Sequence, residues 1–288
     1  LEKFGRKSSE FSSCCANYGR VYHHKADYQE AEKWYLEAKD IREKVLGRQH
    51  PKYCVVLNNL AIVYGDMGNY EKAERLYLEA YDIFDKVIGK EHPTYAIILN
   101  GLSTLYLALG RYEEAEHFCI ESKKKKKKSL GKEHPDYAIC LNNLALIHEF
   151  MGNYKNVELN YLESKAIVEK VRGKEHPDYA NSLDLLAGLY QKMGNYEKAE
   201  PLFLENKDIV EKVMGKNHPD YAACLQNLGA LYSSMGNFEK SEMFYLEAQS
   251  IFEKVLGQEH PIYANSLHSL AILYRNMGKL NQAETIAS

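Results

Sequence analysis

Residues 50–89 read HPKYCVVLNNLAIVYGDMGNYEKAERLYLEAYDIFDKVIG, and this stretch decides the fold because it returns along the chain. Its opening dipeptide, His-Pro, recurs at a constant interval of 42 residues. The copies begin at His50, His92, His134, His176, His218 and His260. A fixed period of this length indicates one supersecondary unit stacked on copies of itself.

Each repeat contains two helical patterns separated by a short break. In the second copy, Pro51 suits the first position of a helix because its missing N–H needs no partner there. Apolar residues then recur at intervals of three and four, at Tyr53, Leu57, Leu60, Ala61 and Tyr64. Gly68 can take the left-handed conformation that ends helices, and a second periodic run follows from Ala73 to Val87. We therefore predict antiparallel helix pairs of about four and about five turns.

The period predicts an all-α chain that forms one array of stacked helix pairs over residues 1–288. Six full pairs are expected at 10–47, 52–89, 94–131, 136–173, 178–215 and 220–257, with a partial seventh at 262–288. Because the chain opens at Leu1 and closes inside a helical pattern at Ser288, we expect a fragment of a longer protein.

Composition argues for binding to proteins rather than to nucleic acid or membrane. The net charge is -3, and no apolar run approaches the length of a membrane span. The six cysteines follow neither a CxxC spacing nor the 42-residue period, so we interpret them as small buried hydrophobes. Unpaired cysteines suit a reducing compartment, which predicts a cytoplasmic protein.

The sequence predicts no enzyme, no cofactor and no metal. None of the common phosphate-binding, zinc-protease or serine-hydrolase signatures is present. The six periodic histidines cannot share a metal, because equivalent atoms of stacked helix pairs are separated by about 20 Å. We expect them to act in the loop where the first helix starts. Cys14 and His23 lie on opposite faces of one helix, which also argues against zinc.

The repeated pattern resembles the tetratricopeptide repeat. The signature of that repeat has a large residue, a Leu followed by a small residue, and a Tyr in the first helix, and an Ala four residues before an aromatic residue in the second. Here these positions are Leu57, Leu60, Ala61, Tyr64, Ala73 and Tyr77, and the signature returns in every copy with minor changes. The 42-residue form, with LNNLA and a G-K-E-H-P loop, is similar to the variety in kinesin light chains. The resemblance covers about residues 11–288. It implies an α-solenoid with a right-handed superhelix, whose first helices line the concave side.

A second stripe of residues on each first helix lies on a different face of the helix from the core stripe of Leu57, Leu60 and Tyr64. The resemblance places this second stripe in the concave groove. In the second repeat it runs through Val55, Asn59, Ile62 and Asp66. The candidate peptide-binding residues on this stripe are Asn17, Arg20, Asn59, Ile62, Asn143, Leu146, Phe150, Asn181, Lys192, Asn227 and Asn265. The stripe is apolar in the third and fourth repeats and more polar in the fifth and seventh. A peptide with an apolar anchor and polar flanks would suit it.

Asparagines at one position of this stripe form a broken ladder, at Asn17, Asn59, Asn143 and Asn227. An amide both donates and accepts, so it can pair with a peptide backbone of any sequence. The matching Asn of kinesin light chains contacts extended cargo peptides, so the resemblance implies the same role for these asparagines. The alternative is that these amides cap or bridge helices within the stack. The family's clamp for a terminal carboxylate is not expected, because only Arg20 and Lys192 supply positive charge, four repeats apart.

Lys123 to Lys128 is an unusual run in the second helix of the third repeat. Lys125 stands where other repeats have isoleucine, and this substitution predicts a locally loosened helix. A basic docking patch is the alternative.

The favoured function is a non-enzymatic scaffold that binds a protein or an extended peptide. One alternative is the sensor or regulatory array of a larger effector, such as a caspase-like protease or a nucleotide-binding ATPase. Another is end-to-end self-association through the incomplete seventh repeat, which should expose apolar surface.

Overall fold

The computed structural model describes residues 8–287, and every regular element in that range is helical. The first helices of the pairs are α1 (Ser9–His24), α3 (Pro51–Asp66), α5 (Pro93–Ala108), α7 (Pro135–Phe150), α9 (Pro177–Lys192), α11 (Pro219–Ser234) and α13 (Pro261–Asn276). The second helices are α2 (Tyr28–Leu46), α4 (Tyr70–Ile83), α6 (Tyr112–Leu130), α8 (Tyr154–Arg172), α10 (Tyr196–Met214), α12 (Phe238–Leu256) and α14 (Leu280–Ala287). A π-helical turn, η1 (Phe84–Ile88), continues α4. The predicted all-α fold of successive helical hairpins is confirmed.

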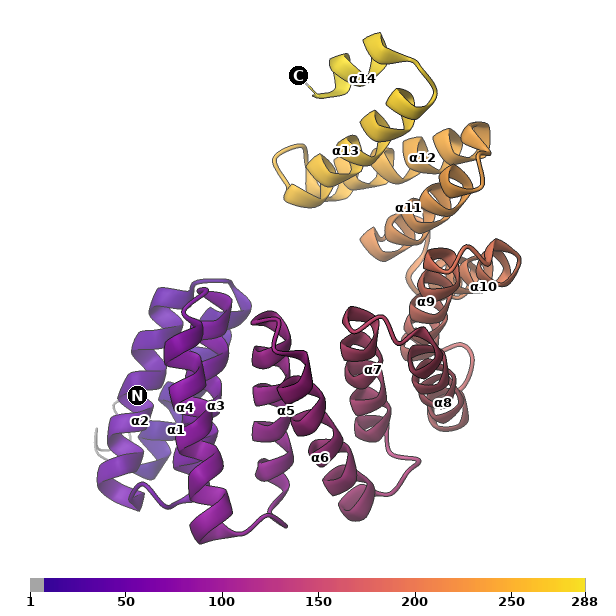
Figure 1. The fold of residues 1–288 in the computed structure, drawn as a ribbon. Coiled ribbons are helices and arrows are strands. Elements are labelled where there is room, and N and C mark those ends of the chain that lie inside the picture. The colour runs from indigo at the N-terminus through magenta and orange to yellow at the C-terminus, as the bar shows by residue number, and fades with distance from the viewer. Residues whose placement is uncertain (1–7, 288) are drawn as a thin grey trace. The chain divides into compact units, whose positions relative to one another are not determined.

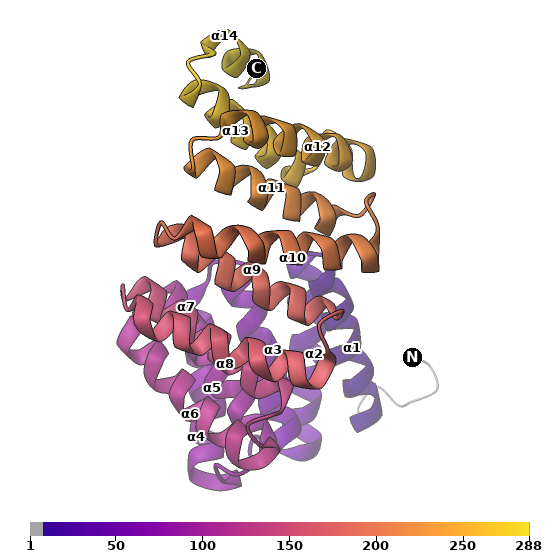
Figure 2. The ribbon, with the colours of Figure 1, turned by 90° about the vertical axis from the view of Figure 1, so that its right-hand side faces the viewer.

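The chain divides into two compact units that meet in sequence at Asn153 and Tyr154. Unit 1 contains α1 to α7, and each helix packs against the next one along the chain (Figure 1). Unit 2 contains α8 to α14 and follows the same rule (Figure 2). Within each unit, the consecutive packing buries one face of every helix between its sequence neighbours.

The periodic histidines cap the first helices. At His50 the backbone is extended, and Nδ1 of the ring accepts a hydrogen bond from the backbone N–H of Lys52 at 3.1 Å. The same bond recurs in α5, α7, α9, α11 and α13, at 3.1–3.2 Å. Each ring therefore satisfies one of the backbone N–H groups that a helix start leaves without an intrahelical partner. Proline follows at the first helical position, where its missing N–H costs nothing.

The break between the two helices of a pair has the predicted glycine and an unpredicted cap. Gly68 has φ of +74°, the left-handed conformation expected of a helix terminator. The next residue, Asn69, accepts a hydrogen bond from the backbone N–H of Lys72 at 3.3 Å through its side chain. The turn therefore ends one helix and starts the next within a few residues.

The core follows the small-beside-large pattern of the sequence. Leu57, Leu60 and Tyr64 are buried on the inner face of α3. In α11, a Cβ atom on Gly229 would lie 2.7 Å from the ring of Tyr245 in α12, closer than packed atoms approach. The glycine therefore permits the two helices to cross at the tyrosine ring.

From α3 onward, a hydrogen bond from the end of each first helix joins it to the preceding second helix. Tyr64 Oη donates to Glu32 Oε1 at 2.6 Å, across 32 residues of sequence. Burial and then this glutamate raise the pKa of Tyr64 to about 12. Equivalent bonds join Tyr106 to Glu74, Tyr190 to Glu158, Tyr232 to Glu200 and Tyr274 to Glu242. In α7 the residue is His148, and its Nε2 lies 2.9 Å from Glu116. The interaction between repeats thus survives the change from tyrosine to histidine.

Candidate functional site

The predicted binding stripe lies at the protein surface in both units. We define the first-helix stripe as Val55, Asn59, Ile62 and Asp66 of α3 together with the residues at multiples of 42 positions from them on the other first helices. The stripe is treated separately in each unit. In unit 1 its candidate residues are Asn17, Arg20, Asn59, Ile62, Asn143, Leu146 and Phe150, each exposed or half-buried. In unit 2 they are Asn181, Lys192, Asn227 and Asn265, again exposed or half-buried. All eleven side chains are therefore accessible to a partner.

Large apolar side chains gather on the stripe of α5 and α7. Ile97 and Ile139 are 52% and 49% exposed, and Leu146 and Phe150 are 41% and 58% exposed. Helices α5 and α7 contact one another within unit 1. The ring of Phe150 also stacks on Tyr112, with centroids 5.7 Å apart. Apolar surface concentrated on adjacent elements in this way is typical of an interaction site.

A shallow cavity of about 260 Å³ lies on the stripe of α3 and α5. Its lining includes Ile62, Asp66 and Thr104 from the stripe, and Tyr77 from α4. Gly101 stands here in place of the ladder asparagine. A Cβ atom on it would lie only 2.3 Å from the Tyr77 ring. The interruption of the ladder therefore has a packing cause, because the tyrosine occupies the space a side chain would need.

Two ladder asparagines bridge neighbouring repeats. Asn143 Nδ2 donates to Asn100 Oδ1 at 2.8 Å, which joins α7 to α5. Asn227 Nδ2 donates to Asp184 Oδ1 at 2.7 Å, which joins α11 to α9. The bridging role that the sequence left open is therefore present at both positions. An amide has two N–H groups and one carbonyl oxygen, so each side chain retains capacity for a peptide backbone.

Other polar residues of the first helices pair at the same separation of 43 residues. His23 Nε2 lies 2.6 Å from Asp66 Oδ2, between α1 and α3. Gln191 and Gln226 donate to Ser234 and Ser269, each at 3.2 Å. Sequence reasoning missed these pairs because it compared positions 42 residues apart. In the packing of adjacent first helices, each of these residues instead lies beside the residue 43 positions later in the sequence.

Asn17 and Asn59 make weaker and more local contacts. Asn17 Oδ1 accepts from Arg20 at 3.5 Å within α1, and Asn59 Oδ1 accepts from its neighbour Asn58 at 3.4 Å. Both distances are at the long end for a hydrogen bond. Of the four ladder amides, these two are therefore the less firmly held by the stack.

The cysteines, histidines and carboxylates of the described chain do not gather into a group that could hold a metal ion. Among residues 8–287 no group of three or more His, Cys, Asp and Glu side chains is placed to hold a metal ion. The cysteines are free, and all but Cys14 are buried. Burial raises the pKa of the Cys54, Cys119 and Cys224 thiols to about 12 in each case. These thiols are therefore protonated and poor nucleophiles at neutral pH.

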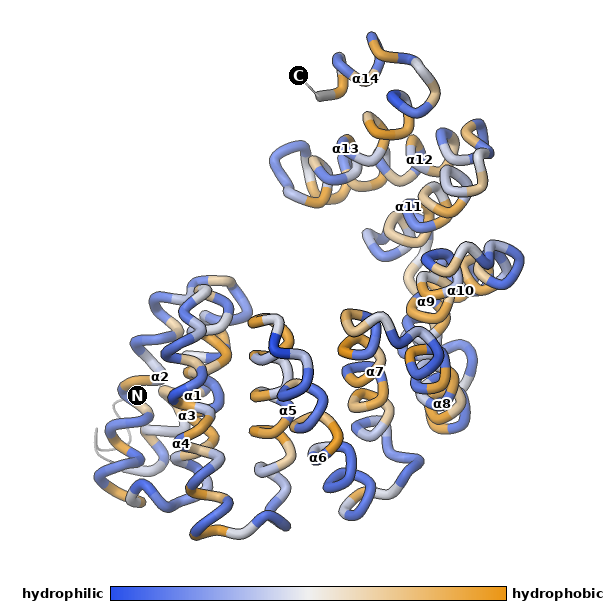
Figure 3. Tube along the Cα trace, viewed as in Figure 1, coloured by the Kyte–Doolittle hydropathy of each residue, from blue (hydrophilic) through white to orange (hydrophobic). Residues whose placement is uncertain are grey.

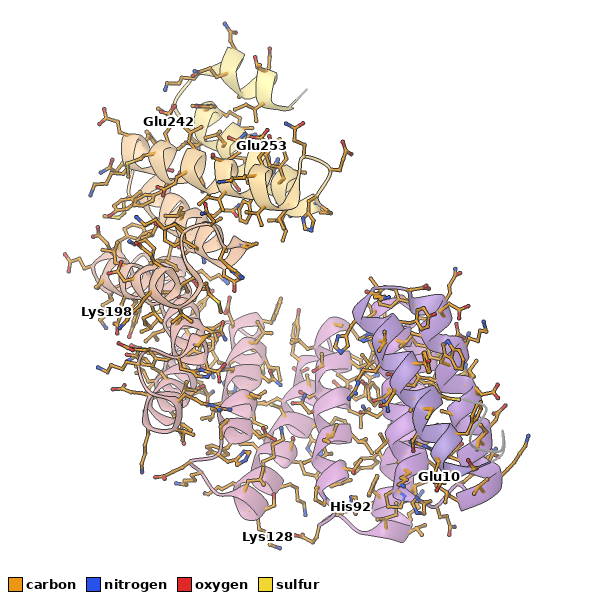
Figure 4. All side chains as sticks on the ribbon, turned by 180° about the vertical axis from the view of Figure 1, so that it is seen from behind. Glu10, His92, Lys128, Lys198, Glu242 and Glu253 are labelled. Atoms are coloured by element: carbon orange, nitrogen blue, oxygen red, sulfur yellow. The ribbon has the colours of Figure 1, made fainter. Side chains whose placement is uncertain are left out.

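The lysine run forms the C-terminal half of α6, a hydrophilic segment of the trace in Figure 3. Lys125 Nζ and Lys128 Nζ each lie 2.9 Å from a carboxylate oxygen of Glu91. Figure 4 places Lys128 and His92, the neighbour of Glu91, at the same end of unit 1. Hydrogen bonds from Lys125 and Lys128 lower the pKa of Glu91 to about 2. Two charges of the run are thus directed to a residue of the same unit.

None of the described helices is both long enough and apolar enough to traverse a lipid bilayer.

Stacked helical hairpins with an exposed stripe on the first helices define a helical-repeat protein. The sequence profile of the tetratricopeptide repeat family matches residues 12–86, 54–119, 94–164, 158–205, 184–254 and 227–287. The chain therefore belongs to the tetratricopeptide repeat family. Arrays of this family are typical of protein-interaction scaffolds, and the fold is generally non-catalytic.

Three solved structures illustrate the similarity. BtubC from P. vanneervenii shares 24% identity over 82% of this chain and 93% of that chain, with a TM-score of 0.67. Kinesin-light-chain-like repeats from Podosopora anserina share 25% identity over 71% of this chain and 97% of that chain, with a TM-score of 0.62. A signal transduction ATPase with a tetratricopeptide repeat sensor, from Pyrococcus horikoshii, shares 18% identity over 96% of this chain and 41% of that chain, with a TM-score of 0.72. No curated protein matches this chain.

Proposed function

We propose that this protein is a non-enzymatic scaffold that binds an extended peptide, or an extended segment of a protein partner, on its first-helix stripe. The observation that carries the proposal is the apolar surface of α5 and α7, formed by Ile97, Ile139, Leu146 and Phe150. An apolar side chain of the peptide anchors there, because burying such surface is the main source of affinity in peptide grooves. The remaining amide capacity of Asn143 then pairs with the peptide backbone.

The test is selection from a peptide library, followed by affinity measurements on a matched pair of variants. Leu146→Ser removes an apolar side chain from the stripe, where Leu146 is 41% exposed. Leu78→Ser is the control, because Leu78 is 39% exposed but lies on the second helix α4 of the same unit. We expect Leu146→Ser to weaken a selected peptide about tenfold, and Leu78→Ser to leave its affinity unchanged. Equal effects of the two substitutions would contradict the proposal.

The ladder amides need a separate test, because they also serve the stack. Asn59→Ala combined with Asn143→Ala removes two amides that face the peptide. Asn100→Ala removes only the stacking partner of Asn143 and leaves its amide in place. Weaker binding in the double variant, with normal binding in Asn100→Ala, would support contact with the peptide backbone. Unchanged affinity in the double variant would contradict it.

A second candidate function is a sensor array within a larger signalling effector. It is favoured by the Pyrococcus protein, whose tetratricopeptide repeats are described as the sensor of an ATPase. The mass of the intact native protein tests this proposal. A product much larger than 33.1 kDa would support it, and a product of that mass would favour a separate adaptor.

A third candidate is self-association through the seventh repeat. The observation in its favour is Leu280 at the start of α14, which is 59% exposed. Sedimentation equilibrium over a wide concentration range tests it, since a mass that stays at that of one chain would contradict self-association.

A further inference from the structure

A pocket of about 310 Å³ lies in unit 2, between α9, α10 and α11. Its polar lining comprises the carboxylates of Asp184 and Asp220 and the amides of Asn181, Asn206 and Asn227. Its apolar wall is formed by Ile209, Val210, Val213 and Met214 of α10. None of the described residues that line it is a lysine, arginine or histidine. The pocket thus combines acidic side chains of α9 and α11 with aliphatic side chains of α10.

Asp184 is the half-buried carboxylate of this pocket. Its Oδ1 atom accepts hydrogen bonds from Asn227 Nδ2 at 2.7 Å and from Asn206 Nδ2 at 3.2 Å. Lys207 and Lys212 of α10 pair with Asp208 and Glu175. Burial raises the pKa of the Asp184 carboxyl, and no basic side chain among residues 8–287 contributes to that shift. A negative charge is therefore held in a partly desolvated site without a compensating cation, an arrangement that costs free energy.

The charge is not needed for the bridge between repeats. Asn58, Asn100 and Asn142 occupy the equivalent position of α3, α5 and α7. Asn100 accepts the bond from Asn143 with its amide oxygen, as Asp184 accepts from Asn227. An asparagine at position 184 would preserve the bridge, so the carboxylate supplies something that the stack does not require.

We propose that this pocket binds a lysine side chain of the partner, whose ammonium group pairs with Asp184 and whose aliphatic stem lies against the α10 wall. This inference rests on the proposed peptide-binding function and specifies the partner's chemistry. Charge complementarity selects a cation, and the volume lies at the lower end of ligand pockets, which suits one side chain.

Lysine suits the site better than arginine. Oδ1 of Asp184 already accepts two amide hydrogen bonds, so only Oδ2 retains its full accepting capacity. A guanidinium fork needs both carboxylate oxygens, whereas an ammonium group can bond to one. The side chain of Asp220, the second carboxylate, is 64% exposed, and its Oδ2 atom lies 3.6 Å from His218 Nδ1. Asp220 therefore adds negative potential at the rim of the pocket rather than a second buried hydrogen-bond acceptor.

The experiment is selection from an N-terminally acetylated peptide library with the wild-type protein, Asp184→Asn and Asn100→Asp. Acetylation removes the terminal amine, so an enriched ammonium group must come from lysine. Asp184→Asn installs the residue that three other repeats use, so the helix pair is retained. Asn100→Asp is the reciprocal control, because it places a carboxylate at the equivalent position of unit 1, away from the pocket. We expect the wild type and Asn100→Asp to enrich lysine at one position about tenfold over norleucine and more than arginine. Asp184→Asn should lose this enrichment while apolar anchors are still selected.

Each outcome is decisive. Equal lysine enrichment in Asp184→Asn, or enrichment of apolar anchors alone by the wild type, would overturn the pocket and leave the peptide-binding function standing. Absence of any enriched sequence would contradict the peptide-binding function instead. In that case N-acetyl-lysine N-methylamide, compared with its norleucine analogue by NMR, still tests the pocket. Shifts of the Asn206 and Asn227 side-chain amides with the lysine compound alone would support it, and their absence would overturn it.

Discussion

Replacing Lys125 by isoleucine is expected to stabilise unit 1. The other full-length second helices have isoleucine at this position: Ile41, Ile83, Ile167, Ile209 and Ile251. Ile41 and Ile167 are 8% and 9% exposed, and Ile83, Ile209 and Ile251 are half-buried. The Lys125 side chain is 23% exposed, and its ammonium group extends to Glu91. The position is therefore one that the repeat ordinarily uses for burying an apolar side chain.

The magnitude follows from burial and from the ion pair that is lost. Burying a whole isoleucine side chain contributes about 1.5–3 kcal/mol. The lysine stem already covers part of the surface, so about half of that gain is expected, roughly 0.75–1.5 kcal/mol. The ion pair with Glu91 that is lost is exposed to solvent, and exposed ion pairs contribute little to stability. The free energy of unfolding should therefore rise by about 0.75–1.5 kcal/mol.

Urea denaturation of the two variants Lys125→Ile and Ile167→Lys provides the measurement. The second variant makes the reverse change in α8 and should lower the free energy of unfolding by about 0.75–1.5 kcal/mol. A Lys125→Ile protein no more stable than the wild type would refute the reasoning. In the wild type, amide exchange should be fastest around residues 120–131, and strong protection there would contradict a locally loosened α6.

Three further outcomes are expected. His176→Ala removes the ring that caps α9 and should lower the free energy of unfolding by about 0.5–2 kcal/mol in urea denaturation, whereas no change would mean that the cap contributes nothing. The Glu91 carboxyl should titrate near pH 2 by NMR, because its lysine partners favour the charged form. The stabilising effect of these ion pairs is complete above pH 4.5 and is lost as the pH falls toward 2. Titration of Glu91 near pH 4.5 would contradict the ion pairs. Cys14 should react with a thiol reagent well before the buried Cys54, whose pKa is raised to about 12, and equal rates would contradict the packing.

The helical hairpins could be predicted from the sequence because their signals are local and repeated. Pro51 and Gly68 mark a helix start and a helix end, and the spacing of Leu57, Leu60 and Tyr64 identifies the buried face. Each signal involves residues within a few positions of one another. Repetition along the chain then removes the ambiguity that a single amphipathic stretch would have.

The contacts between repeats could not be predicted in the same way, because they depend on how one hairpin is rotated and shifted against the next. The bond from Tyr64 to Glu32 and the bridge from Asn143 to Asn100 join positions offset from the 42-residue period. His148 offered one signal, since it replaces the tyrosine opposite a retained glutamate. Asp184 was overlooked because its helix position was assigned to neither the core stripe nor the first-helix stripe.

Methyl NMR of the complex with a library-selected peptide tests the central claim most directly. The account predicts shift changes at the methyl groups of Ile97, Ile139 and Leu146 on the first helices, while those of Leu78 on α4 stay unchanged. Changes confined to Leu78 and other second-helix methyl groups, with the first-helix stripe unaffected, would contradict it.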